Sequence, residues 1–325
     1  MNKTLITGGL GYIGSHIAYH LKNEAVILDN QLNSNLNYKK LLPMATVVIG
    51  DCNFKNVSRI FKKFEIEKVI HLAGYKAVNE SIKSPIEYYE NNFYSSLDLI
   101  RAMDNFKITN LIFSSSATVY GNKNQSPFNE ESLLESLNPY ASTKIAIEQL
   151  IRDYSKSKKN FKSFILRYFN PIGANLKSGL SDQPLGKPLN LMPVLIESVI
   201  NKKTFEIFGS NYSTKDGTCI RDYIHVDDLA LAHLKALKCI NKIKGSVELN
   251  VGMGNGLSVL EFIKIFQRTN NIKIKFKFGK KREGDCAESY ASIKKAKKIL
   301  GWNPKRSYEN MMFDSWNAYL NRKKI

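Results

Sequence analysis

Short apolar runs recur along the first half of the chain, and each one ends at small or polar residues. They lie at 4–7, 25–29, 46–51, 68–74, 110–116 and 163–169. Because these runs are almost continuous in Val, Ile, Leu and Phe, they are typical of parallel strands that are buried on both faces. Segments with helical periodicity lie between them, for example 86–105 and 140–155. The alternation predicts an α/β fold built on a doubly wound, Rossmann-type parallel sheet.

The pattern loosens after residue 170, where a stretch rich in Gly, Pro and Asn is predicted to be a loop. It is followed by a predicted helix and two predicted strands, at 191–201, 205–209 and 247–252. We therefore expect a first domain over 1–170, to which about 221–251 returns, and a smaller C-terminal α/β domain over 171–325 that binds the substrate.

The 325 residues are 43% hydrophobic, which is enough for a sizeable buried core. No apolar run approaches the ~18 residues of a membrane-spanning helix, so we expect a cytoplasmic protein with no membrane partner. The cysteines are widely scattered and lack the close spacing of a zinc site. We expect free, mostly packed thiols and no metal at Cys52, Cys219, Cys239 and Cys286.

The chain carries 48 basic and 29 acidic residues and a net charge of +19. A charge of this size can indicate a nucleic-acid partner. The lysines are spread along the chain, however, and the dense clusters "SKSKK" and "GKKR" are short. We therefore expect a solvated basic surface and no nucleic acid, and an acidic small-molecule substrate is also compatible with this charge.

A glycine-rich segment, "TGGLGYIG", follows the first predicted strand and precedes a helix. Gly8, Gly11 and Gly14 give the spacing that lets backbone approach a pyrophosphate at a helix N-terminus. The second predicted strand ends at Asp29, whose carboxylate can accept hydrogen bonds from adenosine ribose hydroxyls and would repel a 2′-phosphate. These residues predict a site for NAD rather than NADP.

Residues 138–144 read "NPYASTK", in which Tyr140 and Lys144 lie one helical turn apart. By itself this spacing is typical of any surface helix. The predicted strand at 110–116, however, ends in three serines, and ligands gather at the carboxyl ends of strands in such a sheet. We expect Ser116, Tyr140 and Lys144 to converge beside a nicotinamide ring.

These three side chains suit the oxidation of an alcohol. A hydroxyl group can lose hydride to a nicotinamide only if its proton also leaves, and a tyrosinate is a suitable base. The ordinary pKa of tyrosine is about 10, and the positive charges of Lys144 and the nicotinamide are expected to bring the pKa of Tyr140 towards neutrality. Ser116 can hydrogen-bond the same hydroxyl and pass its proton on.

Longer stretches carry a family resemblance. "TGGLGYIG", "NPYASTK" and "SSSATVYG" resemble the extended short-chain dehydrogenase/reductase superfamily. "VIHLAGYKAVNES", "YYENN", "LRYFNPIGA", "DGTCIRDYIHVDDLA" and "REGD" resemble its UDP-glucose 4-epimerase family, over nearly the whole chain. Related 4,6-dehydratases carry an Asp-Glu pair where this chain has Ala117 and Thr118, so the resemblance favours an epimerase.

The resemblance implies an NAD-dependent isomerase of galactose metabolism that acts on UDP-sugars. Tyr140, assisted by Ser116, would take the proton from the sugar O4 while hydride passes from C4 to NAD. The 4-keto sugar would then turn over and be reduced on its opposite face, and Lys144 would contact the nicotinamide ribose. The family also forms homodimers through helices like those at 86–105 and 140–155.

The resemblance also implies two sets of contacts. For NAD, besides the glycine loop, these are Tyr12, Ile13, Asp29, Asn30, Asn33, Ser34, Asp51, Cys52, Leu72, Ala73, Gly74, Lys76, Asn91, Ser114, Tyr140, Lys144 and Phe169. For the UDP-sugar these are Ser116, Asn170, Asn190, Leu191, Phe208, Arg221, Arg282, Asp285 and Ser289. Two arginines suit a diphosphate, whereas Leu72 and Leu191 could instead be core residues.

Two positions depart from the family pattern. Ser289 stands where a bulky Tyr often lines the sugar pocket, and a smaller residue there suggests that UDP-GlcNAc and UDP-GalNAc are accepted as well. The neighbouring Tyr290 could still turn into that space. Ser292 replaces a usual Asp and is expected to cap the following helix.

Two alternatives stay open. The chain could epimerise another UDP-sugar, such as UDP-glucuronate or UDP-xylose; an acidic sugar would want an extra basic group near C6, which the sequence cannot place. It could also be a non-catalytic nucleotide-binding or RNA-binding protein on the same fold, although the presence of Ser116, Tyr140 and Lys144 argues against this.

Overall fold

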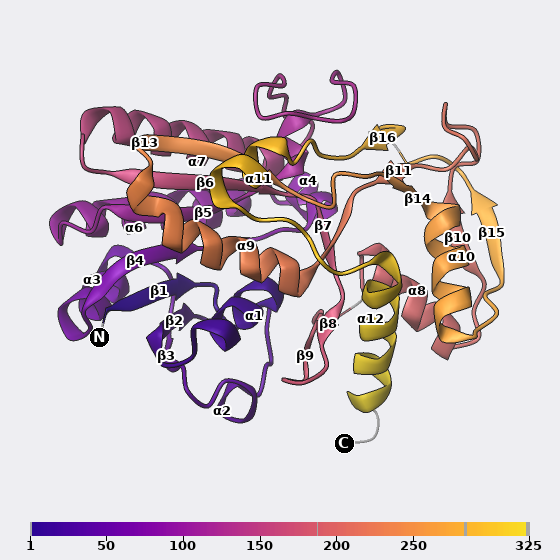
Figure 1. Cartoon of the computed structure of the whole chain (residues 1–325), viewed down its shortest axis with the longest axis horizontal. Coiled ribbons are helices and arrows are strands. Elements are labelled where there is room, and N and C mark those ends of the chain that lie inside the picture. Colours follow the sequence, from indigo (N-terminus) through magenta and orange to yellow (C-terminus); the bar gives the residue numbers. More distant parts are fainter. Residues whose placement is uncertain (1, 187, 283–284, 323–325) are drawn as a thin grey trace.

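A seven-stranded parallel sheet forms the larger part of this computed structural model, which describes residues 2–186, 188–282 and 285–322 (Figure 1). The strand order is β13-β6-β5-β4-β1-β2-β3, and all neighbouring pairs are parallel. The strands are β1 (Lys3–Thr7), β2 (Ala25–Asp29), β3 (Thr46–Ile49), β4 (Ile66–His71), β5 (Asn110–Ser116), β6 (Lys162–Tyr168) and β13 (Gly245–Val251). The predicted doubly wound α/β fold is confirmed.

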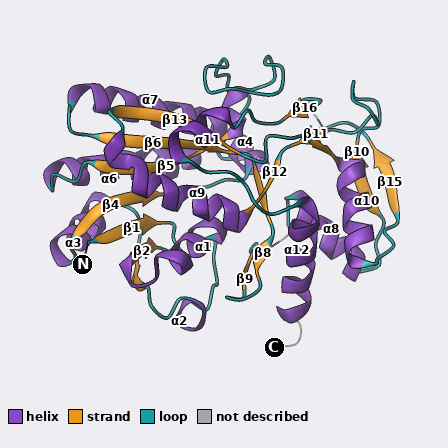
Figure 2. Ribbon diagram, in the orientation of Figure 1, coloured by secondary structure: helices purple, strands orange, loops and turns teal. Residues whose placement is uncertain are grey.

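Helices cover both faces of this sheet (Figure 2). The helices of this part are α1 (Tyr12–Leu21), α2 (Tyr38–Leu41), α3 (Phe54–Lys63), α4 (Val78–Lys83), α5 (Pro85–Tyr88), α6 (Ser95–Asn105), α7 (Pro139–Ser157), α9 (Val226–Cys239) and α11 (Lys294–Leu300), of which α4 and α5 pack against α7. Successive strand residues join different cores: Leu5 packs in the cluster of α3, α6 and α7, whereas Ile6 packs in the cluster of α1 and α9. Burial on both faces explains why the strands are continuously apolar.

A smaller region lies beyond the carboxyl ends of the large sheet. Its helices are α8 (Leu191–Ile200), α10 (Val259–Asn270) and α12 (Tyr308–Arg322). Its strands are short: β7 (Asn170–Ile172), β8 (Ala174–Asn175), β9 (Leu180–Ser181), β10 (Phe205–Phe208), β11 (Ile220–Arg221), β12 (Tyr223–His225), β14 (Leu257–Ser258), β15 (Phe276–Gly279) and β16 (Glu288–Ser289). The apolar faces of the three helices and of β10 share one core.

The chain returns to the large sheet after entering the smaller region. β13 pairs with β6, α9 packs against α1, and α11 packs against both α9 and β13. The division at residue 170, with 221–251 returning, stays a prediction.

The segment predicted as one helix over 86–105 is interrupted. A π-helical turn over Tyr89–Tyr94 lies between α5 and α6. Such turns are frequent at functional sites. Here the turn buries Asn92, whose side chain accepts a hydrogen bond from the Tyr75 amide at 2.7 Å and donates to Thr143 Oγ1 at 3.2 Å. Asn92 therefore ties the loop after β4 to α7.

The predicted cap of α11 is wrong. The N-cap is Ile293, and no side chain caps this end. The Ser292 amide instead donates to the Phe128 carbonyl at 2.7 Å, which holds this residue in an extended link. The helix consequently begins too late for Ser292 to cap it.

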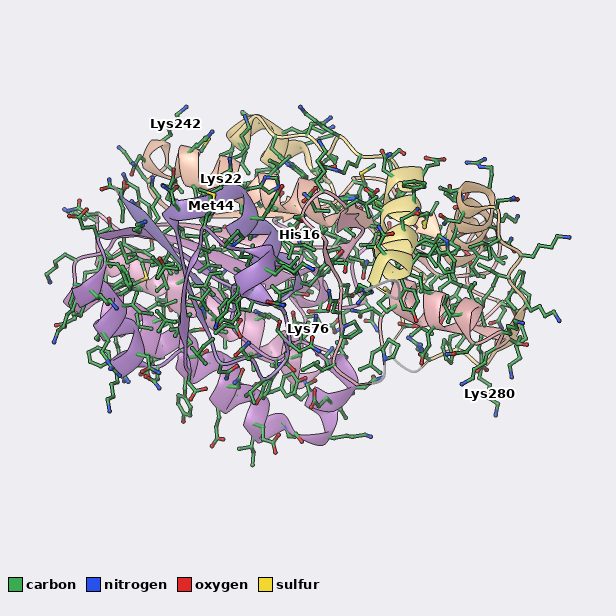
Figure 3. The ribbon with its side chains drawn as sticks, turned by 90° about the horizontal axis from the view of Figure 1, so that it is seen from below. His16, Lys22, Met44, Lys76, Lys242 and Lys280 are labelled. Carbon is green, nitrogen blue, oxygen red and sulfur yellow. The ribbon has the colours of Figure 1, made fainter. Side chains whose placement is uncertain are left out.

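The net positive charge of the chain is consistent with a surface on which lysines are widely spread and exposed to solvent. Lys242 and Lys280 lie at opposite ends of the molecule, with Lys76 between them (Figure 3). Within the described ranges, no helix is both long and apolar enough to cross a membrane. The four cysteines are free; Cys219 is buried and the other three are half-buried.

Candidate active site

The glycine loop connects β1 to α1 and is fixed by close backbone approaches. Gly8 has φ +70°, and a Cβ there would lie 2.7 Å from the Ala73 nitrogen at the end of β4. A Cβ on Gly14 would lie 2.5 Å from the Gly8 carbonyl oxygen. The N-cap of α1, Gly11, offers no side-chain cap to the first amides of the helix. This side-chain-free cradle at a helix N-terminus fits a dinucleotide pyrophosphate.

Asp29 ends β2 beside this loop. Its carboxylate accepts hydrogen bonds from the Leu10 amide at 3.0 Å and the Gln31 amide at 2.8 Å. Ser34 Oγ donates to the Leu10 carbonyl at 2.7 Å, so the loop after β2 folds back on the glycine loop. Asn30 donates to Asp51 at 2.9 Å. Four of the predicted NAD contacts therefore gather beside the glycine loop at the ends of β2 and β3: Asp29, Asn30, Ser34 and Asp51.

The remaining predicted NAD contacts differ in exposure. Asn33 and Lys76 are exposed, and Leu72, Ala73, Gly74 and Asn91 are half-buried at the end of β4 and in the π-helical turn. Tyr12 donates to the Gly173 carbonyl at 2.7 Å, and Ile13 packs on the sheet core. Cys52 contacts the Ser95 carbonyl, and burial raises its pKa to about 12. Phe169 is buried in a separate apolar cluster with Val119, Tyr120 and Phe128.

Helix α7 begins where the sequence predicts and places the reactive pair. Asn138 caps it by accepting from the Ala141 amide at 2.9 Å, and Pro139 occupies the first turn. Tyr140 is 9% and Lys144 is 5% exposed. Lys144 Nζ donates to the Ser114 carbonyl at 2.8 Å and lies 5.8 Å from the centre of the Tyr140 ring. Helix α7 and the end of β5 thus bring Tyr140 and Lys144 together.

Ser116 lies at the end of β5 and faces Tyr140. Its Oγ accepts hydrogen bonds from the Thr118 amide at 3.2 Å and the Thr118 hydroxyl at 3.0 Å. Because both contacts use its lone pairs, its own proton is free to be donated. Thr118 therefore orients the serine.

Burial shifts the pKa values of both members of the pair. Burial raises the pKa of Tyr140, and the hydrogen bond with Ser116 lowers it only in part. Burial also lowers the pKa of Lys144 to about 8, against the opposing effect of Glu148. Desolvation therefore dominates the pKa of Tyr140 in the protein alone. The expectation that Lys144 and the nicotinamide charge together bring this pKa towards neutrality stays a prediction.

A second group of predicted residues lies on short strands and loops of the smaller region. Arg221, on β11, approaches Asp285 at 3.4 Å. Arg282 stacks on Phe208 of β10, with its guanidinium carbon 3.8 Å from the ring centre. β16 pairs in parallel with β11, which places Ser289 opposite Arg221. Five predicted UDP-sugar contacts therefore belong to neighbouring strands and loops; Glu283 and Gly284 of the "REGD" stretch lie outside the described residues.

The other predicted substrate contacts approach from the β6–α8 segment. Asn170 begins β7, and its side chain donates to the Asp222 carbonyl at 2.7 Å. Asn190 is the N-cap residue of α8; its side chain is exposed and makes no capping hydrogen bond. Leu191 is half-buried against the smaller core, so part of its role is packing.

The buried Asp222 was missed by sequence reasoning. Its carboxylate is 0% exposed and accepts hydrogen bonds from the amides of Met253, Gly254 and Ala291 at 2.7–3.1 Å. Its own amide donates to the Ser289 carbonyl at 3.0 Å. Asp222 thereby joins the strand of Ser289 to the loop after β13; its position directly after Arg221 was the available signal.

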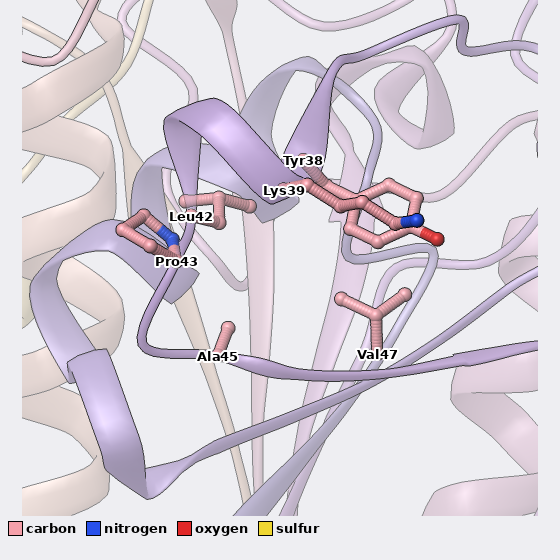
Figure 4. Close-up of a pocket in the computed structure, with 6 residues that line it drawn as sticks. All are labelled: Tyr38, Lys39, Leu42, Pro43, Ala45 and Val47. Atoms are coloured by element: carbon pink, nitrogen blue, oxygen red, sulfur yellow. The ribbon is translucent and has the colours of Figure 1, made fainter.

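The hollow drawn in Figure 4 lies away from these groups. It has a volume of about 450 Å³ and is lined by α2 and the start of β3, an outer strand of the sheet. Its lining contains none of the predicted site residues: Tyr38, Lys39, Leu42, Pro43, Ala45 and Val47. Among the residues that the structure describes, no group of His, Cys, Asp and Glu could hold a metal ion.

Residues 4–252 match the family model described as "NAD dependent epimerase/dehydratase family". The chain belongs to this family. NAD is its cofactor, and the glycine cradle and Asp29 fit that group. The resemblance found in the sequence is confirmed.

Individual relatives are similar over their full length. A UDP-glucose 4-epimerase of Bacillus subtilis is 42% identical over 322 residues, covering 96% of this chain and 95% of the relative. A crystal structure of UDP-glucose 4-epimerase from Bifidobacterium longum in complex with NAD⁺ and UDP has a TM-score of 0.93 and 37% identity, covering 99% of both chains. The UDP-Glc/GlcNAc 4-epimerase of Campylobacter jejuni has a TM-score of 0.85 and 33% identity, covering 99% of this chain and 100% of the other.

Proposed function

We propose that the chain interconverts UDP-glucose and UDP-galactose by inverting carbon C4 of the hexose, with NAD as its bound cofactor. The observation that carries this is the meeting of Ser116, Tyr140 and Lys144 at the end of β5, two strands from the glycine loop. Full-length similarity to proteins named UDP-glucose 4-epimerase supports the choice of substrate. Purified protein given UDP-galactose should form UDP-glucose; a protein that retains NAD but forms none would contradict the proposal.

The roles of the three residues follow from their contacts. Tyr140 takes the proton from O4, and burial keeps its hydroxyl out of water until a sugar is bound. Ser116 has a free proton with which to bridge O4 and Tyr140. The Lys144 ammonium, fixed on the Ser114 carbonyl, offsets the charge that develops on the tyrosinate. The glycine cradle and Asp29 would hold NAD, which would supply the acceptor and donor for the C4 hydride.

The nucleotide-sugar contacts anchor UDP while the sugar turns over. Arg221 and Arg282 supply two guanidinium groups, which bind phosphate oxygens bidentately. Phe208 is 37% exposed, and the Arg282 guanidinium stacks on its ring. Both side chains are therefore accessible to a nucleotide. Firm binding of UDP with few contacts to the hexose allows the keto sugar to present its other face.

N-acetylated sugars form a second candidate substrate class. Ser289 is smaller than the Tyr that the family resemblance often implies at this position, and the Tyr290 ring lies elsewhere. That ring lies against Gly256, where a Cβ would come within 3.0 Å of Tyr290 Cδ1. Alternate residues of a strand point to opposite faces, so Tyr290 is directed away from Ser289.

The test uses UDP-GlcNAc with wild-type protein and with Ser289→Tyr. We expect wild type to turn over both UDP-GlcNAc and UDP-galactose, and the variant to lose the first activity while keeping the second. Wild-type turnover of UDP-galactose without turnover of UDP-GlcNAc would remove the N-acetyl part of the proposal.

A homodimer is our proposal for the oligomeric state. Apolar side chains are exposed on α4, α5 and the π-helical turn, of which the last two overlap the segment 86–105 that the family resemblance implies. These side chains are 43–72% exposed: Ile82, Ile86, Tyr89 and Tyr94. Analytical ultracentrifugation should give a dimer, and Ile86→Glu should shift it to a monomer; a wild-type monomer at micromolar concentration would contradict this.

We also propose that the enzyme works in the cytoplasm. Four free thiols suit a reducing compartment. Fractionation of cells that produce the chain should recover it with cytosolic markers.

A further inference from the structure

The three serines that end β5 each engage a different group of the site. The Ser114 carbonyl accepts from Lys144, and the Ser115 hydroxyl donates to Glu148 Oε1 at 2.5 Å. Ser116 faces Tyr140. Lys144 and Glu148 lie four residues apart on α7, so β5 binds two successive turns of the helix that carries the tyrosine.

Glu148 is a fully buried carboxylate with an unusually complete set of partners. It is 0% exposed, and Arg167 of β6 binds it bidentately, with Nε at 3.0 Å and Nη2 at 2.7 Å. Arg152, one turn further along α7, donates at 3.2 Å. The carboxylate therefore links α7 to both β5 and β6.

Arg167 is also buried and makes further hydrogen bonds of its own. It is 2% exposed and donates to the Tyr120 hydroxyl and the Glu130 carbonyl, both at 3.0 Å. Arg152 also reaches Glu248 of β13 at 3.1 Å. These contacts fix the position of Glu148, which lies one turn of α7 beyond Lys144.

Within the described part of the chain, the other groups recorded against Lys144 carry no negative charge. From β5 it meets the Ser114 carbonyl and the Phe113 ring, whose centre is 4.9 Å from Nζ. From β4 it faces His71, which hydrogen-bonds Thr7 and Ser96, and whose pKa burial and Lys144 lower to about 3, so it stays neutral. Glu148 is the group that opposes the effect of burial on Lys144.

We propose that Glu148 is a positioning residue of the active site, which fixes the turn of α7 that carries Lys144 and supplies the opposite charge for its ammonium. Its role in turnover rests on the proposed function, since Lys144 acts there beside Tyr140. The carboxylate touches neither substrate nor cofactor and acts through Lys144.

The test replaces Glu148 by Gln and follows two quantities. In selectively ¹³Cε-lysine-labelled protein, the Lys144 signal, assigned with Lys144→Met, should titrate near pH 8 in wild type and about one pH unit lower in Glu148→Gln. The alkaline limb of the kcat profile should move in the same direction, and kcat at pH 7.5 should fall about tenfold. Asp153→Asn, which neutralises an exposed carboxylate on the same helix, should change neither.

A double variant separates this role from simple packing. Glu148→Gln leaves Arg167 buried without its partner and lowers the melting temperature, whereas Glu148→Gln with Arg167→Met removes both charges and should restore it. The lowered Lys144 titration should persist in the double variant. A wild-type Lys144 titration in the double variant would overturn the proposal, because Glu148 would then only balance Arg167. The NMR titration stands even if UDP-galactose is not the substrate, so the two proposals fail separately.

Discussion

The candidate site has two sides that differ in construction. The cofactor side, which comprises the glycine loop, Ser116, Tyr140 and Lys144, lies on long strands and on the 19-residue α7. The nucleotide-sugar side, with Phe208, Arg221, Arg282, Asp285 and Ser289, lies on strands of two to four residues and on loops. The reactive pair is buried, whereas Phe208 is 37% exposed.

This difference places the residues of the reaction and the residues that select the substrate on separate sides of the site. A buried, hydrogen-bonded reactive pair changes little when substrate binds, which favours a fixed reaction. In a short strand, the substitution of a single residue such as Ser289 does not disturb a buried core. Asp222 connects the nucleotide-sugar side to the large sheet, because its backbone amide donates to the Ser289 carbonyl and its carboxylate accepts from the loop after β13.

Removing the Tyr140 hydroxyl should have the largest effect and should be confined to the cofactor side. We expect Tyr140→Phe to lower kcat by about 10³-fold, equivalent to about 4 kcal/mol, with little change in UDP binding. Tyr154→Phe on the same helix loses only a bond to Asp104 and serves as the control. A kcat within tenfold of wild type would show that Tyr140 is not the base.

Acid should destabilise the cofactor side through His71. Burial lowers its pKa to about 3. The unfolded chain binds this proton near pH 6.5 and the folded chain does not, so the histidine's contribution to the free energy of unfolding falls as pH drops from 6.5 to 4, by about 3 kcal/mol.

Other groups titrate in this window, and burial raises the pKa of Asp222 to about 7, which acts in the opposite direction. The comparison with His71→Asn isolates the histidine. The stability difference between variant and wild type, from urea unfolding at pH 7 and pH 4, should shift by about 3 kcal/mol in favour of the variant. An unchanged difference would mean that His71 is protonated in the folded state.

Loss of one arginine should affect the nucleotide-sugar side through binding. Arg221→Ala removes a guanidinium that is only 19% exposed. We expect KM for UDP-galactose to rise about 30-fold, equivalent to about 2 kcal/mol, with kcat largely kept. Lys203→Ala, which removes an exposed cation of the same region, is the control. A fall in kcat with unchanged KM would place Arg221 in the chemistry instead.

The smallest expected effect concerns the stability of the region that carries the nucleotide-sugar side. Ser258 and Glu261 form a capping box at the start of α10, and Ser258 also donates to Asp216. Ser258→Ala should lower the free energy of unfolding by about 1 kcal/mol. Measured by urea unfolding at pH 7, this loss should leave kcat unchanged, and a large loss of kcat would show that the two sides are more tightly coupled than their construction suggests.

The strands and the reactive pair could be predicted because their signals are local. Leu5 and Ile6 must both be apolar, since neighbouring strand residues enter opposite cores. Pro139 and the Asn138 cap mark the start of α7, so the placement of Tyr140 and Lys144 follows from adjacent residues.

The remaining features depend on partners far apart in the chain. Asp222 binds amides about thirty and seventy residues away, at Met253 and Ala291. Glu148 finds Arg167 and Ser115 on two different strands. Hydropathy and spacing describe only single segments, so neither could pair these groups or predict the direction of the Tyr290 ring.

The central claim is that C4 is oxidised and then reduced by the same hydride, held on bound NAD. The most direct measurement is the conversion of UDP-galactose that carries deuterium at C4, with the product examined by NMR. Our account predicts UDP-glucose that retains deuterium at C4, because the hydride never exchanges with water. UDP-glucose that carries hydrogen from solvent at C4 would contradict it.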